Sequence, residues 1–240
     1  MFTRAPRNRT LNCTQSELES FSRTLVQLTR PVSADELTNR IINQELEAAL
    51  PFLPKCFVDL LILDPPYNLT KNYNGHVFRS RETEEYAAWF ERILVQLLST
   101  LKVNASLYVC SDWKTSNIVF PVLDRHLLVR NRITWEREKG RGAKTNWKNN
   151  TEDIWFCTVG ERYCFNVEAV KLKRRVIAPY RCEDGKPKDW EESQNGNYRL
   201  TYPSNIWGDI TIPFCVLVQR EKDKRLCRVA PCPTLGIRFS

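Results

Sequence analysis

Several residue types and patterns are scarce in this chain of 240 residues. Its two histidines, His76 and His126, show no metal-ligand spacing, which argues against a metal hydrolase. No run of about eighteen apolar residues occurs, so no membrane span is predicted. The first thirteen residues contain arginines but no apolar core, which disfavours a secretory signal and leaves an organellar presequence as an alternative.

Glycine is scarce as well, with eight residues and no GxGxxG motif. Gly140 and Gly142 in KGRGAK predict a mobile loop that could order on a substrate. They do not form a phosphate-binding loop, because no strand–loop–helix frame or GxxxxGK spacing surrounds them.

The nine cysteines are odd in number and form no CxxC pair. We therefore expect reduced thiols and a cytoplasmic location.

Positive charge is concentrated in the middle of the chain. The formal net charge is +8, and residues 130–181 hold thirteen Lys and Arg against six Asp and Glu, whereas residues 1–129 are balanced. Tryptophans and a tyrosine are interleaved with this basic stretch. Such a surface suits a nucleic acid, with cations on phosphates and aromatics on bases; a solvated basic face is the alternative.

Strand and helix patterns alternate along the first two thirds of the chain. Residues 57–63 (FVDLLIL) are a continuous apolar run, as expected for a strand covered on both faces. Apolar residues at spacings of three and four predict a helix over 83–101, with Thr83 as N-cap. The other predicted strands are 38–42, 105–110, 127–135 and 154–159, and the other helical segments are 44–53 and 113–125. This alternation predicts an α/β, doubly wound sheet.

The strongest chemical signal is the tetrad Asp64-Pro65-Pro66-Tyr67, directly after the apolar strand. Ligands of open α/β sheets bind beyond the carboxyl ends of the strands. Asp64 and the Pro65 carbonyl could accept hydrogen bonds from an exocyclic amine, and Tyr67 could stack on an extruded base. A Pro-Pro turn that simply ends the strand is the alternative.

The loop DPPYNL after an apolar strand resembles the catalytic motif of DNA amino-methyltransferases that modify adenine N6 or cytosine N4. EYAAWFERIL with SLYV, NRITWEREKGRG and NNTEDIWF resemble later segments of the same family, in the β-type order. The resemblance implies a Rossmann-like sheet, S-adenosyl-methionine as cofactor, and Asp64 and Glu45 as residues that bind it. Asp at the first tetrad position favours adenine.

The same resemblance implies a double-stranded DNA substrate, with a restriction endonuclease and a homodimer as further expected partners. It divides the chain into an N-terminal extension (1–37), a catalytic domain (38–160), a target-recognition region (161–214) and an atypical tail (215–240). Glu152 could position a strand or cap one, and we expect the second. The expected DNA-binding residues are Arg137, Lys139, Arg141, Lys144, Lys148, Lys171, Lys173, Arg174 and Arg175.

The sequence departs from the family pattern after residue 214. The glycine turn that brings the backbone close to S-adenosyl-methionine is absent, and the central strand before it is expected to be missing too. A truncated or frame-altered relative that binds the cofactor weakly, or needs a second chain, is one prediction. A DNA-binding protein without transferase activity, a cytosine-N4 enzyme, and an RNA or protein-glutamine methyltransferase are the alternatives.

Overall fold

The computed structural model describes residues 14–73, 76–137, 144–177, 180–191, 193–194, 196–208, 210 and 235–238. The helices are α1 (Gln15–Ser22), α2 (Ala34–Leu37), α3 (Leu46–Ala49), α4 (Thr83–Leu98) and α5 (Trp113–His126), with 3-10 turns η1 (Leu50–Phe52) and η2 (Val167–Val170). The strands are β1 (Leu25–Val26), β2 (Ile41–Ile42), β3 (Val58–Asp64), β4 (Lys71–Tyr73), β5 (His76–Phe78), β6 (Leu101–Ser111), β7 (Leu128–Glu136), β8 (Thr151–Thr158), β9 (Leu172–Arg175), β10 (Tyr198–Thr201), β11 (Ile206–Trp207) and β12 (Leu235–Arg238).

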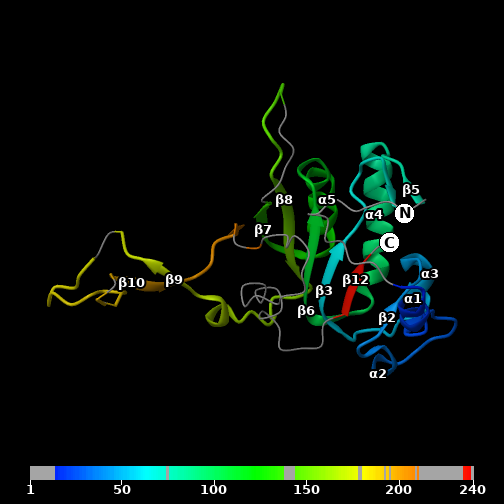
Figure 1. Ribbon diagram of the computed structural model, residues 1–240, viewed down its shortest axis with the longest axis horizontal. Coiled ribbons are helices and arrows are strands. Elements are labelled where there is room, and N and C mark those ends of the chain that lie inside the picture. Colours follow the sequence, from blue (N-terminus) through cyan, green and yellow to red (C-terminus); the bar gives the residue numbers. More distant parts are fainter. Residues whose placement is uncertain are drawn as a thin grey trace.

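A twisted sheet forms the centre of the molecule (Figure 1), with strand order β11-β7-β8-β6-β3-β12. Strand β3 is parallel to both β6 and β12, and β11 is parallel to β7. Strand β8 runs antiparallel to its two neighbours, β6 and β7. The predicted α/β sheet is confirmed, and its parallel part contains the strand that ends in Asp64.

The two faces of the sheet bury different side chains. Leu61 and Leu63 of β3 belong to the large core cluster, which includes the apolar faces of α4 and α5. Leu60 of β3 packs on the opposite face, against Tyr108 and Phe156, whose rings stack with centroids 4.8 Å apart. Because successive strand residues point to opposite faces, covering both faces accounts for the unbroken apolar run in β3.

Helices α4 and α5 confirm the predicted helical segments but differ at their ends. The N-cap of α4 is Glu82, which makes no side-chain capping bond, so the assignment of Thr83 as the cap is wrong. The N-cap of α5 is Asp112, whose carboxylate accepts from the Thr115 amide at 2.8 Å. Pro121 lies inside α5 without ending it.

Short elements near the amino end of the described chain form a separate layer. The predicted strand at 38–42 is confined to β2, which pairs with β1 in parallel, and the segment 44–53 folds as α3 followed by η1. A small core of Leu28, Leu37 and Ala49 joins these pieces. Phe57, which directly precedes β3, packs against this core, so the layer lies near the amino end of β3.

The tail contributes a strand where we expected none. Residues 235–238 form β12, with Leu235 opposite Leu61 and Arg238 opposite Asp64. The sequence predicted that the central strand before the glycine turn would be missing, and β12 lies parallel to β3 on this side of the sheet. Gly236 lies within β12, opposite Ile62, and not in a turn after it. Residues 211–234, which hold most of the tail, lie outside the described residues.

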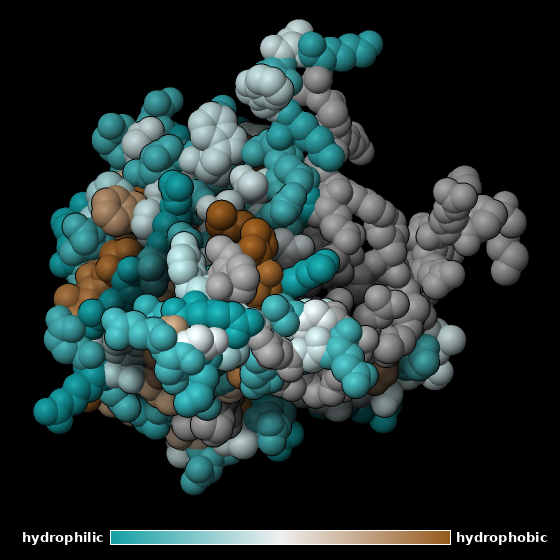
Figure 2. All heavy atoms as spheres, turned by 90° about the vertical axis from the view of Figure 1, so that its left-hand side faces the viewer, coloured by the Kyte–Doolittle hydropathy of each residue, from teal (hydrophilic) through white to brown (hydrophobic). Residues whose placement is uncertain are grey.

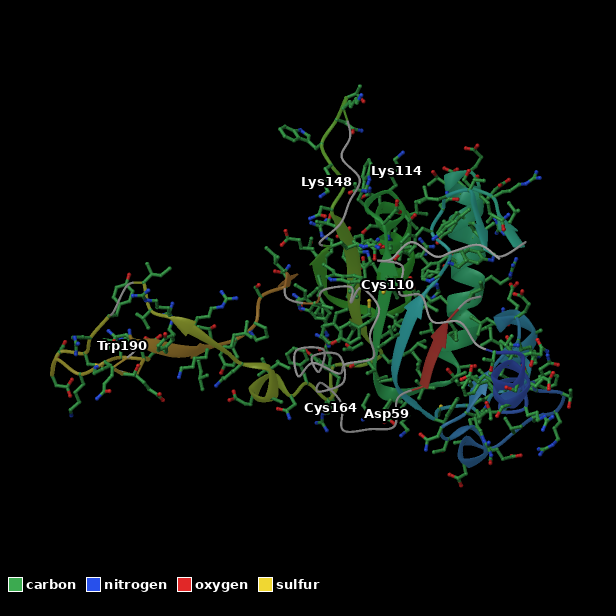
Figure 3. The ribbon with its side chains drawn as sticks, in the orientation of Figure 1. Asp59, Cys110, Lys114, Lys148, Cys164 and Trp190 are labelled. Atoms are coloured by element: carbon green, nitrogen blue, oxygen red, sulfur yellow. The ribbon has the colours of Figure 1, made fainter. Side chains whose placement is uncertain are left out.

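A two-stranded arm projects from the body of the molecule (yellow and orange in Figure 1). It contains β9 and β10, which pair antiparallel with Arg174 opposite Arg199. Figure 2 views the molecule from the side of this arm and shows a mainly hydrophilic surface with scattered apolar side chains. Trp190 is buried near the arm's outer end, where its indole donates to the Tyr180 carbonyl at 2.8 Å (Figure 3).

Candidate functional site

Polar side chains meet at one edge of the central sheet. The parallel strands β3 and β6 end there, at Asp64 and Ser111. Strand β8 runs the other way and therefore begins at this edge, at Thr151, opposite the end of β7 at Glu136. The ends of four strands thus meet at this edge, which is the place where open α/β sheets bind ligands.

Strand alternation places several of these side chains on one face. Asp64 follows Leu60 and Ile62 in steps of two, and Cys110 follows Tyr108 in the same way. Glu152 precedes Ile154 and Phe156 on β8 with the same spacing. Asp64, Cys110 and Glu152 therefore share the face opposite α4 and α5. Figure 3 shows Cys110 near the tip of β3.

The tetrad loop is held from behind by hydrogen bonds. Tyr86 of α4, which is fully buried, donates its hydroxyl to the Pro66 carbonyl at 2.9 Å. The Asn68 amide donates to Thr115 Oγ1 at 3.0 Å, and the Asn68 side chain forms a two-way pair with the Arg81 backbone at 2.7 and 2.8 Å. Residues from two helices thereby fix the loop, while the Asp64 side chain stays exposed.

The hydroxyl of Tyr67 lies between two carboxylates. It donates to Glu152 Oε2 at 3.5 Å. Burial raises the pKa of the Tyr67 phenol, and the charges of Asp64 and Glu152 raise it further. The same surroundings raise the pKa of the Cys110 thiol to about 12, mainly through burial. Both groups therefore stay protonated at neutral pH, and Tyr67 is available as a hydrogen-bond donor.

Glu152 is the centre of a small network and does not cap a strand, contrary to our expectation. Its second carboxylate oxygen pairs with the Arg137 guanidinium. The Arg137 guanidinium also lies 5.8 Å from the centroid of the Trp135 ring, and Trp135 donates to the Ile210 carbonyl at 2.8 Å. Burial raises the pKa of Glu152, and Asp64 adds to this rise, while Arg137 opposes it.

Three buried polar atoms at this edge have no hydrogen-bond partner among the described residues: Ser111 Oγ, Arg137 Nε and Asn150 Oδ1. Ser111 is the last residue of β6, and Asn150 directly precedes β8. Buried polar groups are normally paired, so these three atoms are exceptions to that rule near the tetrad.

The structure brings together some of the predicted site residues and separates others. Asp64, Pro65, Pro66 and Tyr67 form one loop at the strand edge. Glu45 is the N-cap residue of α3. Helix α3 belongs to the layer at the amino end of β3 and is drawn apart from the tip of that strand (Figure 1). Lys139 and Arg141 fall outside the described residues.

Of the predicted DNA-binding residues that the structure describes, Arg137 pairs with Glu152, and the others occupy two further places. Lys144 and Lys148 lie on the exposed segment before β8, which projects beyond the tetrad edge (Figure 3). The second place is the arm and the residue before it, with Lys171, Lys173, Arg174 and Arg175. Lys171 pairs with Glu168 at 2.6 Å and lies over the Tyr202 ring, and Lys173 lies over the Tyr198 ring at 4.9 Å.

Sequence reasoning gave little weight to Glu152 and missed two features of this site, the contact of Glu152 with Tyr67 and the support of the loop by Tyr86. The partners lie 85 and 20 residues apart in the chain. The regular alternation in β8 was a usable signal for the face of Glu152. Its contact with Tyr67 could be known only from the pairing of β8 with β6.

A family model described as DNA methylase matches residues 58–227 of the chain. The chain belongs to this family. The match begins at the first residue of β3 and includes the tetrad, β8 and the arm. The family transfers methyl groups from S-adenosyl-methionine to amino groups of DNA bases, so S-adenosyl-methionine is the cofactor.

Curated relatives agree with the family assignment of this chain. It is 25% identical to the type II methyltransferase M.HpaI of Haemophilus parainfluenzae over 182 residues, which are 75% of this chain and 53% of that protein. It is 26% identical to the DNA adenine methyltransferase YhdJ of Escherichia coli (strain K12) over 176 residues, 70% and 56% of the two chains. The chain therefore spans about half the length of these relatives.

A solved structure shows the same fold. The PvuII DNA methyltransferase (cytosine-N4-specific) superposes with a TM-score of 0.50 over 76% of this chain and 58% of the other, at 13% identity. At that identity the likeness establishes the Rossmann-like methyltransferase fold.

Among the described residues, none of the helices has the length and apolar character that a membrane span requires.

The described residues fit one part of a cofactor site. S-adenosyl-methionine carries an ammonium and a sulfonium group, and the exposed Asp64 carboxylate at the β3 edge is suited to a cation. The adjoining strand β12 reaches the same edge with Arg238 opposite Asp64. The glycine turn that allows close backbone approach does not occur in the sequence, so Asp64 is the described residue that best fits the cofactor.

Proposed function

We propose that this DNA methylase acts on the exocyclic N6 amine of adenine in double-stranded DNA. The observation that carries the proposal is the tetrad loop at the sheet edge, with an exposed Asp64 carboxylate and a rigidly held backbone. The first tetrad residue, aspartate, supports adenine over cytosine. The relatives named as type II methyltransferases support a restriction–modification setting with a cognate endonuclease.

The tetrad residues have separate roles in the proposed reaction. An adenine amine is a weak nucleophile because its lone pair is delocalised into the ring. Asp64 and the Pro65 carbonyl accept its two N–H groups and favour a more tetrahedral, reactive nitrogen. S-adenosyl-methionine, when bound, supplies the electrophilic methyl group.

The Pro66 carbonyl is already occupied by Tyr86, which holds the turn and leaves its neighbour Pro65 as the proposed backbone acceptor. Tyr67 supplies a flat face for the extruded base, with stacking of about 1–3 kcal/mol. That is comparable with the few kcal/mol that base extrusion requires.

The proposed DNA path runs from the tetrad edge to the arm. Lys144 and Lys148 on the projecting segment contact phosphates near the extruded base, and Arg174 and Arg175 of the arm contact the flanking duplex. The arm is two strands wide, with exposed cations on both of its faces, which suits insertion beside a groove.

The central test replaces Asp64 by asparagine. The neutral amide of asparagine cannot offer two anionic acceptors, so Asp64→Asn is expected to lower methyl transfer by at least about a hundredfold, the scale for removal of one electrostatic group at a reacting centre. Transfer is measured as labelled methyl incorporated into unmethylated plasmid DNA. Nuclease digestion and mass spectrometry then distinguish N6-methyladenine from N4-methylcytosine. Asp35→Asn, on exposed helix α2, is the matched control and should retain activity.

Unchanged transfer in Asp64→Asn would refute the assigned role, and N4-methylcytosine as product would refute the adenine assignment. DNA affinity should remain within about twofold in this variant, because the proposed phosphate contacts lie elsewhere.

The proposed DNA path is tested through the salt dependence of binding. Each lost phosphate contact reduces the slope of log K against log salt by about 0.9. Lys148→Ala should therefore reduce it by about 1, and a double Arg174→Ala/Arg175→Ala variant by about 2. Lys55→Ala is the control, because Lys55 is exposed at the opposite edge of the sheet, before β3 begins. Equal slopes for all variants would place the DNA elsewhere.

A second candidate is a DNA-binding protein without methyl transfer, which the basic residues of the arm and of the segment before β8 favour. It predicts salt-sensitive DNA binding together with no calorimetric binding of S-adenosyl-methionine. Micromolar cofactor binding with methyl incorporation would exclude it.

A further inference from the structure

Tyr67 is fixed at two ends. Its backbone belongs to the tetrad loop, which Tyr86 and Thr115 hold from the helical side. Its hydroxyl donates to Glu152 at 3.5 Å on the other side of the site. The hydroxyl oxygen lies on the axis about which the phenol ring turns, so its hydrogen bond to Glu152 fixes the position of the far end of the ring and the direction of that axis. Because a phenol O–H prefers to lie in the plane of its ring, the direction of the acceptor also favours one ring plane.

Glu152 is itself held in place. Its side chain is 15% exposed and pairs with Arg137, whose side chain is 38% exposed. Trp135 lies directly opposite Glu152 in the β7–β8 ladder, and the Arg137 guanidinium lies over the Trp135 ring. Arg137 thus holds the Glu152 carboxylate through Oε1 and leaves Oε2 to accept from Tyr67.

Placing this carboxylate beside Asp64 has an energetic cost. Burial and the Asp64 charge both raise the pKa of Glu152. A glutamate that only filled space or capped a strand would not need this position, since a neutral residue of similar size avoids the desolvation cost. Retaining the charge is understandable if its hydrogen bond to Tyr67 is used.

We propose that Glu152, held by Arg137, is a positioning residue that sets the orientation of the Tyr67 ring before the target base arrives. The inference rests on the proposed function, in which Tyr67 stacks on the extruded base. Glu152 acts through the tyrosine hydroxyl and need not touch the base, the DNA or the cofactor.

The proposal makes Glu152 and the Tyr67 hydroxyl one functional unit. Glu152→Ala and Tyr67→Phe should each lower kcat by about tenfold to a hundredfold, the effect expected for a hydrogen bond to a charged group. The double variant should be no worse than the more impaired single variant, because each change removes the same contact. Glu152→Gln keeps an acceptor for the hydroxyl and should recover most of the loss. The KM for DNA should stay unchanged in all of these variants.

The matched control is the next residue of the same strand. Asp153 points to the opposite face of β8 and lies 3.8 Å from Arg132. Asp153→Asn therefore changes another acid of β8, one that lies near Arg132 of β7, and leaves the contact between Glu152 and Tyr67 intact. It should leave kcat within about twofold of the parent chain, as substitutions without shared partners behave independently.

A second readout does not depend on methyl transfer. The full chain is labelled with 13C at the tyrosine ring carbon that bears the hydroxyl, and the Tyr67 signal is assigned by its loss in Tyr67→Phe. In the free protein, Glu152→Ala should shift the Tyr67 signal and leave that of Tyr86 in place. Asp153→Asn should shift neither.

The two readouts separate failure of the inference from failure of the proposed function. An unshifted Tyr67 signal in Glu152→Ala, or losses of kcat that multiply in the double variant, would overturn the positioning role. Absence of methyl transfer by the parent chain would overturn the proposed function, and the Tyr67 signal would then support or overturn the positioning role by itself.

Discussion

Removal of the Tyr86 hydroxyl tests whether the helical layer holds the tetrad loop. The hydroxyl donates to the Pro66 carbonyl at 2.9 Å, and the Tyr86 side chain is fully buried between α4 and the loop. Tyr86→Phe keeps the ring, and therefore the edge contact with Phe78 at a centroid distance of 6.4 Å. The substitution thus removes one donor from a packed site without creating a large cavity.

The magnitude follows from the fate of the Pro66 carbonyl. A typical hydrogen bond contributes about 0.5–1.5 kcal/mol net, and a buried acceptor left without a partner costs about 1–3 kcal/mol. We expect a loss of about 1.5 kcal/mol, because Pro66 is half-buried and water can reach it in part. For a chain of this size, a loss of that magnitude lowers Tm by about 3–6 °C.

The assay is thermal unfolding followed by circular dichroism, with Tyr202→Phe as the control. Tyr202 is 61% exposed, and its hydroxyl contacts Glu168 at 3.4 Å, so its loss should change stability by less than about 0.5 kcal/mol. Methyl transfer should also fall in Tyr86→Phe because the loop is less rigid. An unchanged Tm together with unchanged transfer would refute the conclusion that Tyr86 fixes the tetrad.

Two further predictions concern the core and the pH dependence of stability. Leu94→Ala, at a fully buried position of α4, should cost about 2–5 kcal/mol in urea unfolding, whereas Val95→Ala on the exposed side of the same helix should cost far less; equal losses would refute the packing of α4. Because burial raises the pKa of Glu152 above its ordinary 4.5, the folded protein binds more protons than the unfolded chain just above that pH. The contribution of Glu152 to stability should therefore decline as pH rises through that window, and Glu152→Gln should flatten this part of the pH profile of unfolding free energy.

Much of the sheet could be predicted from local sequence because the relevant signals are short-range. The apolar run before Asp64 identified β3, and the three-and-four spacing identified α4. Helix ends were less accurate: α4 ends at Leu98, three residues before the predicted end, because Leu101 begins β6. The arm strands β9 and β10 escaped prediction, since they have little apolar alternation and pair with each other outside the core.

Sequence alone determined the place of the tetrad at a strand end, because a continuous apolar run followed by Asp-Pro-Pro-Tyr specifies a buried strand and the loop after it. Tertiary structure decided which distant groups surround that loop. Glu152 faces Tyr67 because β8 enters the sheet antiparallel beside β6, and Arg137 reaches Glu152 because β7 pairs with β8 in one register. A shift of one residue would turn Glu152 to the opposite face, and strand pairing between residues far apart in the chain fixes that register.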